Sequence, residues 1–121
     1  MARIMIVDDT KFIRMTLSTI LQNLHHDIIA EAENGQEAVT LYLEHQPDLV
    51  FMDITMPVMS GIEAINKIMQ HDQSAKIIVC SAMGQQKTVV QAIESGAKDF
   101  VVKPFDENRI KETVQRVLHH I

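Results

Sequence analysis

The sequence predicts an α/β fold, a five-stranded parallel sheet with helices on both faces. Short apolar runs and amphipathic segments alternate five times along the 121 residues. The central apolar runs are almost continuously hydrophobic, as is typical of strands that are covered on both faces. Each amphipathic segment lies between two such runs, which is the pattern of right-handed βαβ units and hence of a parallel sheet.

Five runs rich in Ile, Val and Met are expected to form the strands. They lie near residues 3–8, 28–33, 48–53, 76–81 and 99–103. Between them, apolar residues recur at three- and four-residue intervals, the spacing of an amphipathic helix. The clearest stripes are Ile13, Leu17, Ile20, Leu21 and Leu24, then Ile62, Ile65, Ile68 and Met69, and finally Ile110, Val114, Val117, Leu118 and Ile121.

Residues at the expected helix ends agree with this division. Asn34 and Ser60 each precede a helical segment, and a glutamate follows three residues later in both cases, as in a capping box. Gly96 follows the fourth segment, where a left-handed C-cap is expected. Asp106 is placed to cap the last helix. The boundaries therefore support five helices after five strands.

The composition limits the class of protein. Hydrophobic residues make up 46% of the chain, which supports a packed core, and the net charge of −5 argues against a nucleic-acid partner. Cys80 is the only cysteine, which suits a reducing compartment. No apolar run approaches the roughly 18 residues of a membrane span, and a strand-like run at the N-terminus leaves no room for a signal peptide. We expect a cytoplasmic protein of one domain, residues 1–121, with no membrane or nucleic-acid partner.

Residues suited to phosphate chemistry stand at the ends of four predicted strands. Asp8 and Asp9 end the first, Asp53 the third, Ser81 the fourth and Lys103 the fifth. The carboxyl ends of parallel strands meet at one edge, where open α/β sheets bind ligands, so these side chains are expected to lie together. Singly, each aspartate has the ordinary interpretation of a helix cap or turn residue, and the lysine that of a solvated strand end. Together they predict a cation-dependent phosphoryl site.

Three clustered carboxylates need a cation. At an effective dielectric near 20, each pair would repel by roughly 4 kcal/mol. Hard carboxylate oxygens without a nearby His or Cys favour Mg²⁺ over a softer metal. A divalent cation and Lys103 would together balance the three negative charges.

Asp53 is the best candidate for a nucleophile, because it ends the central strand and the other charged residues flank it. Aspartate forms an acyl phosphate in some phosphoryl transfers. The new charge would recruit hydrogen bonds from the Ser81 hydroxyl and from the backbone N–H groups after it. The loop that carries Ser81 would then move, so the sequence predicts a switch and not a turnover enzyme.

Five motifs resemble the receiver domain of two-component response regulators over essentially the whole chain. The resemblance implies a flavodoxin-like (βα)5 fold with strand order 2-1-3-4-5, an order for which the chemotaxis regulator CheY is itself a standard example. The motifs are V-D-D at 7–9, M-D-I-T-M-P at 52–57, Ser81-Ala82, G-A-K-D-F at 96–100 and K-P-F at 103–105.

The resemblance implies a metal site and a phosphoacceptor. Asp53 would receive phosphate from the phosphohistidine of a histidine kinase. Asp8, Asp9, Asp53 and the backbone carbonyl of Thr55 would hold Mg²⁺. Thr55 and Met83 would border the attacking water, although Met83 could equally be a packed loop residue.

The resemblance also implies a switch. Ser81 would be the hydroxyl that moves toward the phosphate, and Phe100 the aromatic residue that packs inward with it. Lys103 would contact the phosphate, and the Lys103-Pro104 bond would be cis, a geometry that X–Pro bonds adopt readily.

Among receivers, S-A-M-G-Q-Q at 81–86 is most similar to chemotaxis regulators of the CheY type. This implies a CheA-like histidine kinase, a downstream target such as a flagellar motor switch protein, and a possible phosphatase. Some members carry Tyr at the position of Phe100, so an output through a phenolic hydroxyl is not implied. No output domain is expected, and binding is expected on the fourth helix, fifth strand and fifth helix. The exposed candidates there are Gln85, Gln86, Val90, Lys98 and Lys111.

Other functions fit the residues less well. An intermediate receiver of a phosphorelay remains an alternative. A phosphatase of the haloacid-dehalogenase type needs D-x-D on its first strand, where this chain has Asp8-Asp9-Thr10. Flavodoxin-like FMN binding needs a hydroxyl- and Gly-rich loop there, and two aspartates would repel the FMN phosphate.

Overall fold

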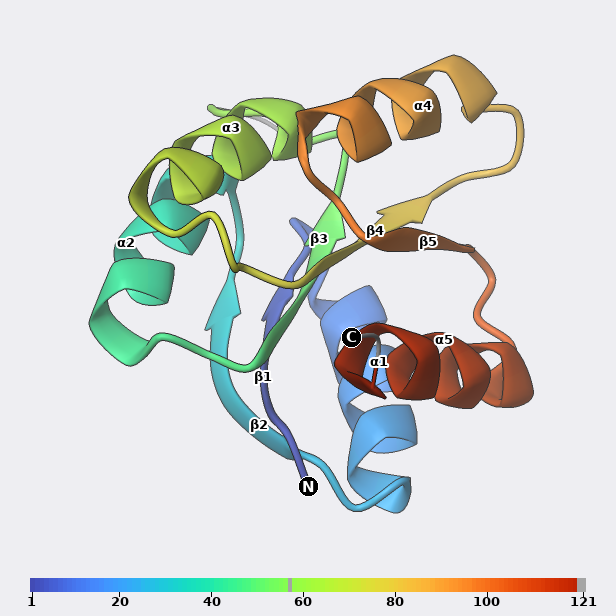
Figure 1. The fold of residues 1–121 in the computed structure, drawn as a ribbon. Helices are drawn as coiled ribbons and strands as arrows, with labels where there is room; N and C mark the ends of the chain where they lie inside the picture. The colour runs from blue at the N-terminus through green and yellow to red at the C-terminus, as the bar shows by residue number, and fades with distance from the viewer. Residues whose placement is uncertain (57, 120–121) are drawn as a thin grey trace.

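The computed structural model describes residues 1–56 and 58–119. Strands and helices alternate throughout the described chain (Figure 1). The elements are β1 (Arg3–Val7), α1 (Lys11–Asn23), β2 (Asp27–Ala32), α2 (Gly35–His45), β3 (Leu49–Asp53), α3 (Gly61–His71), β4 (Ile77–Ser81), α4 (Gln86–Ser95), β5 (Asp99–Val102) and α5 (Glu107–His119).

The five strands form one parallel sheet in the order β2-β1-β3-β4-β5. This confirms the predicted fold class and strand order. Each predicted strand agrees with the observed one to within one residue at either end. β1 and β3 are interior strands of this sheet, with a neighbouring strand on each side.

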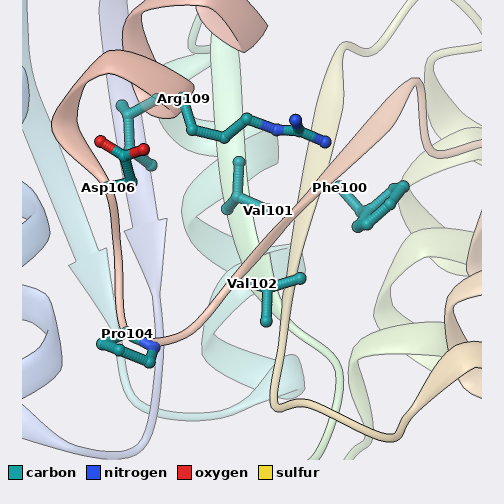
Figure 2. Close-up of a pocket in the computed structure, with 7 residues that line it drawn as sticks. Phe100, Val101, Val102, Pro104, Asp106 and Arg109 are labelled. Carbon is teal, nitrogen blue, oxygen red and sulfur yellow. The ribbon is translucent and has the colours of Figure 1, made fainter.

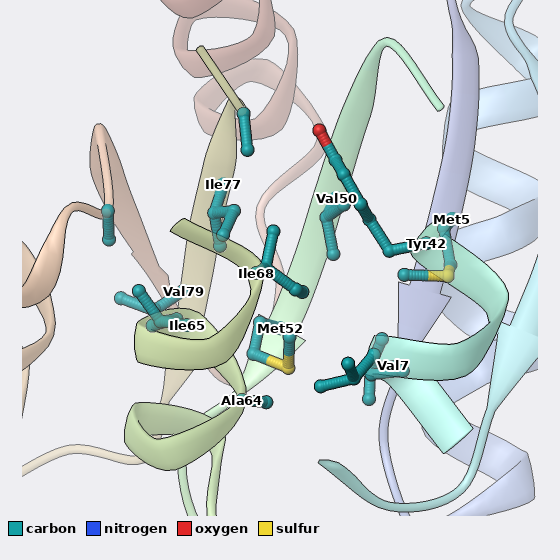
Figure 3. Packing of buried hydrophobic residues seen from close by; sticks show 14 of the residues in the cluster. Met5, Val7, Tyr42, Val50, Met52, Ala64, Ile65, Ile68, Ile77 and Val79 are labelled. Carbon is teal, nitrogen blue, oxygen red and sulfur yellow. The ribbon is translucent and has the colours of Figure 1, made fainter. Parts of the chain in front are cut away.

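Helices cover both faces of the sheet (Figure 1), with α2, α3 and α4 on one face and α1 and α5 on the other. Alternate strand residues point to opposite faces, which gives two buried apolar clusters. Ile6 and Phe51 face α1 and α5, whereas Val7 and Met52 face α2 and α3. Figure 3 shows the second cluster, in which β1, β3 and β4 contribute Met5, Val7, Val50, Met52, Ile77 and Val79 and the helices contribute Tyr42, Ala64, Ile65 and Ile68.

The predicted helix ends are confirmed. The Asn34 side chain accepts a hydrogen bond from the N–H of Glu37 at 2.9 Å, and Ser60 Oγ accepts one from the N–H of Glu63 at 3.2 Å. Gly96 has a φ of 127°, a conformation that glycine adopts without steric cost. The Asp106 carboxylate accepts from the N–H of Asn108 at 3.1 Å, just before α5.

The stripe predicted for the first helix is confirmed in part and omits one residue. Leu17 and Leu21 are buried and Ile20 and Leu24 pack against the same cluster, but the third buried residue of α1 is Arg14. Ile110, Val114 and Val117 of α5 are buried as expected, whereas Ile121 and Pro57 lie outside the described residues. Across residues 1–56 and 58–119, no helix has the length and apolar character needed to cross a membrane.

Candidate functional site

The sheet register brings the predicted site residues to one edge. Val7 pairs with Met52, so Asp8 lies beside Asp53 at the ends of the two central strands. On the other side of β3, Ser81 at the end of β4 pairs with Val102 of β5, and Lys103 follows Val102 directly. The N–H of Lys103 donates to the Ser81 carbonyl oxygen at 2.8 Å, which fixes the chain where it leaves β5.

Three carboxylates gather at this edge. Asp8, Asp9 and Asp53 each offer an oxygen, and these oxygens all lie within 4.8 Å of one another. Asp8 is 3% exposed and Asp53 is 6% exposed, whereas Asp9 is open to solvent. The cluster is therefore accessible to solvent at Asp9, while Asp8 and Asp53 are buried.

Lys103 supplies the positive charge that the sequence predicted. Its Nζ lies 2.7 Å from Oδ2 of Asp8 and 3.6 Å from Oδ1 of Asp53. The Lys103-Pro104 bond is cis, as expected. One ammonium against three carboxylates leaves the site with an excess of negative charge.

Burial and the excess of negative charge together shift the pKa values of Asp53 and Lys103. Burial, and then the charge of Asp8, raise the pKa of Asp53 to about 6, against smaller lowering effects of Lys103 and of the N–H of Thr55. Burial alone would lower the pKa of Lys103, but its hydrogen bond to Asp8 and the charge of Asp53 raise that pKa above its usual value. Asp53 is thus under-stabilised as an anion while Lys103 stays fully charged.

The donor set fits a hard divalent cation. The clustered ligand atoms are carboxylate oxygens, and the cluster found among residues 1–56 and 58–119 contains no His or Cys. Mg²⁺ prefers such oxygens and keeps several waters, which suits a cluster with one open side. A divalent charge would also stabilise the ionised form of Asp53, which the protein alone does not do well. Thr55 lies beside this cluster, and its N–H is 3.4 Å from Oδ1 of Asp53.

Ser81 and Phe100 line a common groove. Ser81 is 2% exposed at the end of β4, and Phe100 is half-buried on β5. The groove has a volume of about 520 Å³ and runs between the loop after β4, α4 and β5, with Val89, Val90 and Val102 on its apolar wall. The structure thus connects the predicted switch residues through one surface depression.

A second cavity, of about 280 Å³, lies where β5 meets α5. Figure 2 shows Arg109 of α5 reaching over β5, while Phe100 points away from Asp106 and Pro104. Phe100 borders both cavities. A change in its position would therefore alter both sides of β5.

Gln85 was expected to be an exposed docking residue, and this expectation is wrong. The side chain is half-buried because both ends of its amide are bonded: Oε1 accepts from the N–H of Ala82 at 2.7 Å, and Nε2 donates to Thr55 Oγ1 at 3.0 Å. Gln86, Val90, Lys98 and Lys111 are exposed, as expected.

Sequence reasoning missed Arg14. Its guanidinium is buried under the site, where Nη1 donates to the backbone carbonyl of Asp8 at 2.7 Å and Nε to Glu31 at 3.0 Å. A signal was present, because Arg14 stands three and seven residues before Leu17 and Leu21 and so shares their face of the helix. Arg14 holds the peptide that carries one of the clustered carboxylates.

Two further residues lie near the site. Cys80 is a buried strand residue, and burial raises the pKa of its thiol far above the ordinary value, so it is not an activated thiolate. Met83 is 80% exposed, which excludes the interpretation of a packed loop residue.

Comparisons with known proteins agree with this geometry. A family model described as response regulator receiver domain matches residues 4–115. The chain is 55% identical over 117 residues to the chemotaxis protein CheY of Bacillus subtilis, covering 97% of this chain and 98% of that protein. It is 55% identical over 115 residues to CheY of Thermotoga maritima, covering 95% and 96% of the two chains.

A solved structure supports the same assignment. The complex of CheX with CheY, BeF3 and Mg²⁺ from Borrelia burgdorferi contains a chain that is 38% identical, with a TM-score of 0.91, covering 95% of this chain and 87% of that one. The family model, the related sequences and the solved structure therefore all indicate the same family. The chain belongs to the family of response regulator receiver domains and is a CheY-like member of it.

Proposed function

We propose that this chain is a chemotaxis response regulator in which Asp53 is the phosphoacceptor. The observation that carries the proposal is the cluster of Asp8, Asp9 and Asp53 at one sheet edge, with Lys103 bonded to it. Asp53 ends the central strand of the sheet and is 6% exposed. A single modification there changes the charge of a confined site.

In the proposed transfer, an Asp53 carboxylate oxygen attacks the phosphorus atom of a phosphohistidine. The new P–O bond forms as the P–N bond breaks, and the imidazole leaves with the electron pair of that bond and takes up a proton from solvent. Lys103 already lies 3.6 Å from Asp53, so its ammonium is placed to stabilise the charge on the transferred group. At neutral pH most of Asp53 is ionised, because its pKa is raised only to about 6.

Asp8, Asp9 and Asp53, with the backbone carbonyl of Thr55, would hold Mg²⁺. When bound, the cation supplies charge neutralisation between the carboxylates and the phosphoryl oxygens. Two contacts fix the position of the Asp8 carboxylate: Oδ1 accepts from the N–H of Thr10 at 2.9 Å and Oδ2 from Lys103 at 2.7 Å. The Arg14 guanidinium holds its backbone carbonyl.

The output would be a rearrangement around Ser81. Phosphorylation exchanges one negative charge on Asp53 for about two, which favours new hydrogen bonds from the Ser81 hydroxyl and from the N–H of Ala82. Movement of this loop would change the groove that Ser81 shares with Phe100. The exposed face formed by α4, β5 and α5 is therefore the proposed surface for the target.

The partners follow from the CheY-like assignment. We propose a CheA-like histidine kinase as phosphodonor and a flagellar motor switch protein as target, in the cytoplasm. A phosphatase partner is also proposed, since a CheY of Borrelia burgdorferi forms a complex with CheX. The exposed side of the acidic cluster would leave room for such a protein to reach Asp53.

The test is phosphorylation by acetyl phosphate in the presence of Mg²⁺. The expected product is a hydroxylamine-labile adduct of about 80 Da, one phosphoryl group, which is absent with EDTA and in Asp53→Ala. Lys111→Ala serves as a control, because Lys111 lies on the exposed surface of α5. Equal labelling of wild type and Asp53→Ala would contradict the proposal, and repeated turnover of a small phosphoester would indicate a phosphatase instead.

A further inference from the structure

The side chain of Gln85 joins two loops across the site. Ala82 follows Ser81 directly, and its N–H donates to Gln85 Oε1 at 2.7 Å. From the other end of the same amide, Nε2 donates to Thr55 Oγ1 at 3.0 Å. Thr55 stands two residues beyond Asp53, in the loop after β3. One amide group therefore connects the loop after β4 to the loop that follows the proposed phosphoacceptor.

The backbone explains why this side chain turns back. Gln85 is the N-cap residue of α4, but its side chain makes no hydrogen bond to its own helix. Asn34 and Ser60, at the same position of α2 and α3, cap their helices in the usual way. Gly84 has a φ of 89°, which reverses the chain so that residue 85 faces residue 82. The Gln85 amide is thus diverted from capping α4 to bridging the two loops.

The bridge occupies the N–H group that the phosphorylated state needs. An amide oxygen and a phosphoryl oxygen are both acceptors, and one N–H directed at Gln85 is not available to a phosphoryl group on Asp53. A charged acceptor forms the stronger hydrogen bond, so a phosphoryl group can displace the neutral amide, but it must first break that contact. The contact therefore favours the unphosphorylated arrangement of the loop.

The neighbouring helix is able to follow such an exchange. Among the described residues of α4, Ala92 is the only buried one, whereas α2 and α3 each bury four. The helix is therefore less firmly buried than α2 and α3, and the Gln85 bridge lies at its N-terminal end. Release of the bridge would loosen α4 and the groove that it forms with β5.

We propose that Gln85 is an internal substitute for a phosphoryl oxygen, a positioning residue that holds the N–H of Ala82 until phosphorylation displaces it. The proposal rests on the proposed function, because it assumes a phosphoryl group on Asp53. It predicts that the bridge lowers the affinity of the site for a phosphoryl group without changing its affinity for the cation. Gln86, the next residue, is exposed and has no such contact in the described structure.

The experiment measures the binding of beryllofluoride, a phosphoryl mimic, in the presence of saturating Mg²⁺, and separately the binding of Mg²⁺ alone. Gln85→Ala is expected to bind beryllofluoride roughly three- to ten-fold more tightly than wild type, the effect of about one net hydrogen bond. Gln85→Met, which keeps the length of the side chain but has no amide, is expected to behave in the same way. Gln86→Ala is the matched control and should bind like wild type. The affinity for Mg²⁺ alone should be the same in all four proteins.

A second measurement does not depend on phosphoryl chemistry. The amide proton resonance of Ala82 in the unphosphorylated protein should shift in Gln85→Ala and Gln85→Met, and stay in place in Gln86→Ala. Unchanged or weaker beryllofluoride binding in both Gln85 variants, with wild-type binding intact, would overturn this proposal alone. If wild type fails to bind beryllofluoride, or if Asp53→Ala binds it equally well, the proposed function fails and this inference with it.

Discussion

The Lys103 ammonium lies 2.7 Å from Oδ2 of Asp8, closer than its 3.6 Å separation from Asp53. In this state the lysine is bonded to a proposed cation ligand and only near the proposed phosphoacceptor. Its side chain is 22% exposed, so solvent reaches the ammonium. Lys103 therefore competes with a cation for Asp8 before phosphorylation, and is free to contact a phosphoryl group once a cation holds Asp8.

Replacing Lys103 should strengthen cation binding. In Lys103→Ala, the hydrogen bond to Asp8 and the repulsion between ammonium and Mg²⁺ both disappear, so the affinity for Mg²⁺ is expected to rise roughly tenfold. Titration of Mg²⁺ by calorimetry gives the affinity. Lys111→Ala is the control for a general loss of positive charge. Weaker Mg²⁺ binding in Lys103→Ala would show that the lysine organises the carboxylates and does not compete for them.

The stability of the metal-free protein should fall as the pH rises through the titration of Asp53. Its pKa is about 6 in the folded protein and 3.8 ordinarily, so the folded state binds more protons between these values. Ionised Asp53 then costs up to ~3 kcal/mol at a pH above 6 and nothing below about pH 4. Asp53→Asn should therefore have the higher melting temperature in EDTA at about pH 7.5, and the difference should vanish near pH 4. A constant difference between the two proteins at both pH values would contradict this account.

Gly61 should not tolerate a side chain. A Cβ atom there would collide with the backbone carbonyl oxygen of Asp53 and lie 2.6 Å from Cα of Ile54, and neither backbone atom can turn aside. Gly61→Ala is expected to lose about 3 kcal/mol in the free energy of unfolding. Gly84→Ala is the comparison, since its Cβ would meet nothing within 4 Å and only its φ of 89° is strained. Urea unfolding should rank Gly61→Ala well below Gly84→Ala, and the reverse order would refute the close approach.

Arg14 should matter for stability more than an exposed arginine does. Arg14→Met leaves the backbone carbonyl of Asp8 without its 2.7 Å donor, and an unpaired buried acceptor costs roughly 1–3 kcal/mol. Arg116→Met is the matched control, because Arg116 pairs with Asp99 on the surface and such pairs contribute about 1 kcal/mol or less. Equal losses in urea unfolding would mean that the buried contact of Arg14 has no special weight.

The sequence predicts the sheet edge well because its signal is local. Buried parallel strands are nearly continuous apolar runs, so the polar residue that ends each run, such as Asp53 or Ser81, is visible in one dimension. The topology then collects these residues without further information. The strand ends and the acidic cluster were therefore predictable to within a residue.

The sequence does not predict contacts that depend on where a long polar side chain turns. Gln85 is a polar residue of the kind expected in an exposed loop, and only the reversal of the chain at Gly84 shows that its amide faces Ala82. Arg14 shares a helix face with Leu17 and Leu21, but only the packing of α1 on the sheet shows that its guanidinium lies under Asp8. Both contacts join residues through a backbone carbonyl or N–H, which no residue pattern encodes.

The most direct test of the account is the location of the phosphoryl group. After treatment with acetyl phosphate and Mg²⁺, reduction of the acyl phosphate with borohydride converts the modified aspartate into homoserine, which tandem mass spectrometry can locate in a peptide. The account predicts the conversion at Asp53 in wild type, and no conversion at Asp8 or Asp9 when Asp53 is replaced by Asn. Conversion at Asp8 or Asp9 in wild type, or none at Asp53, would contradict it.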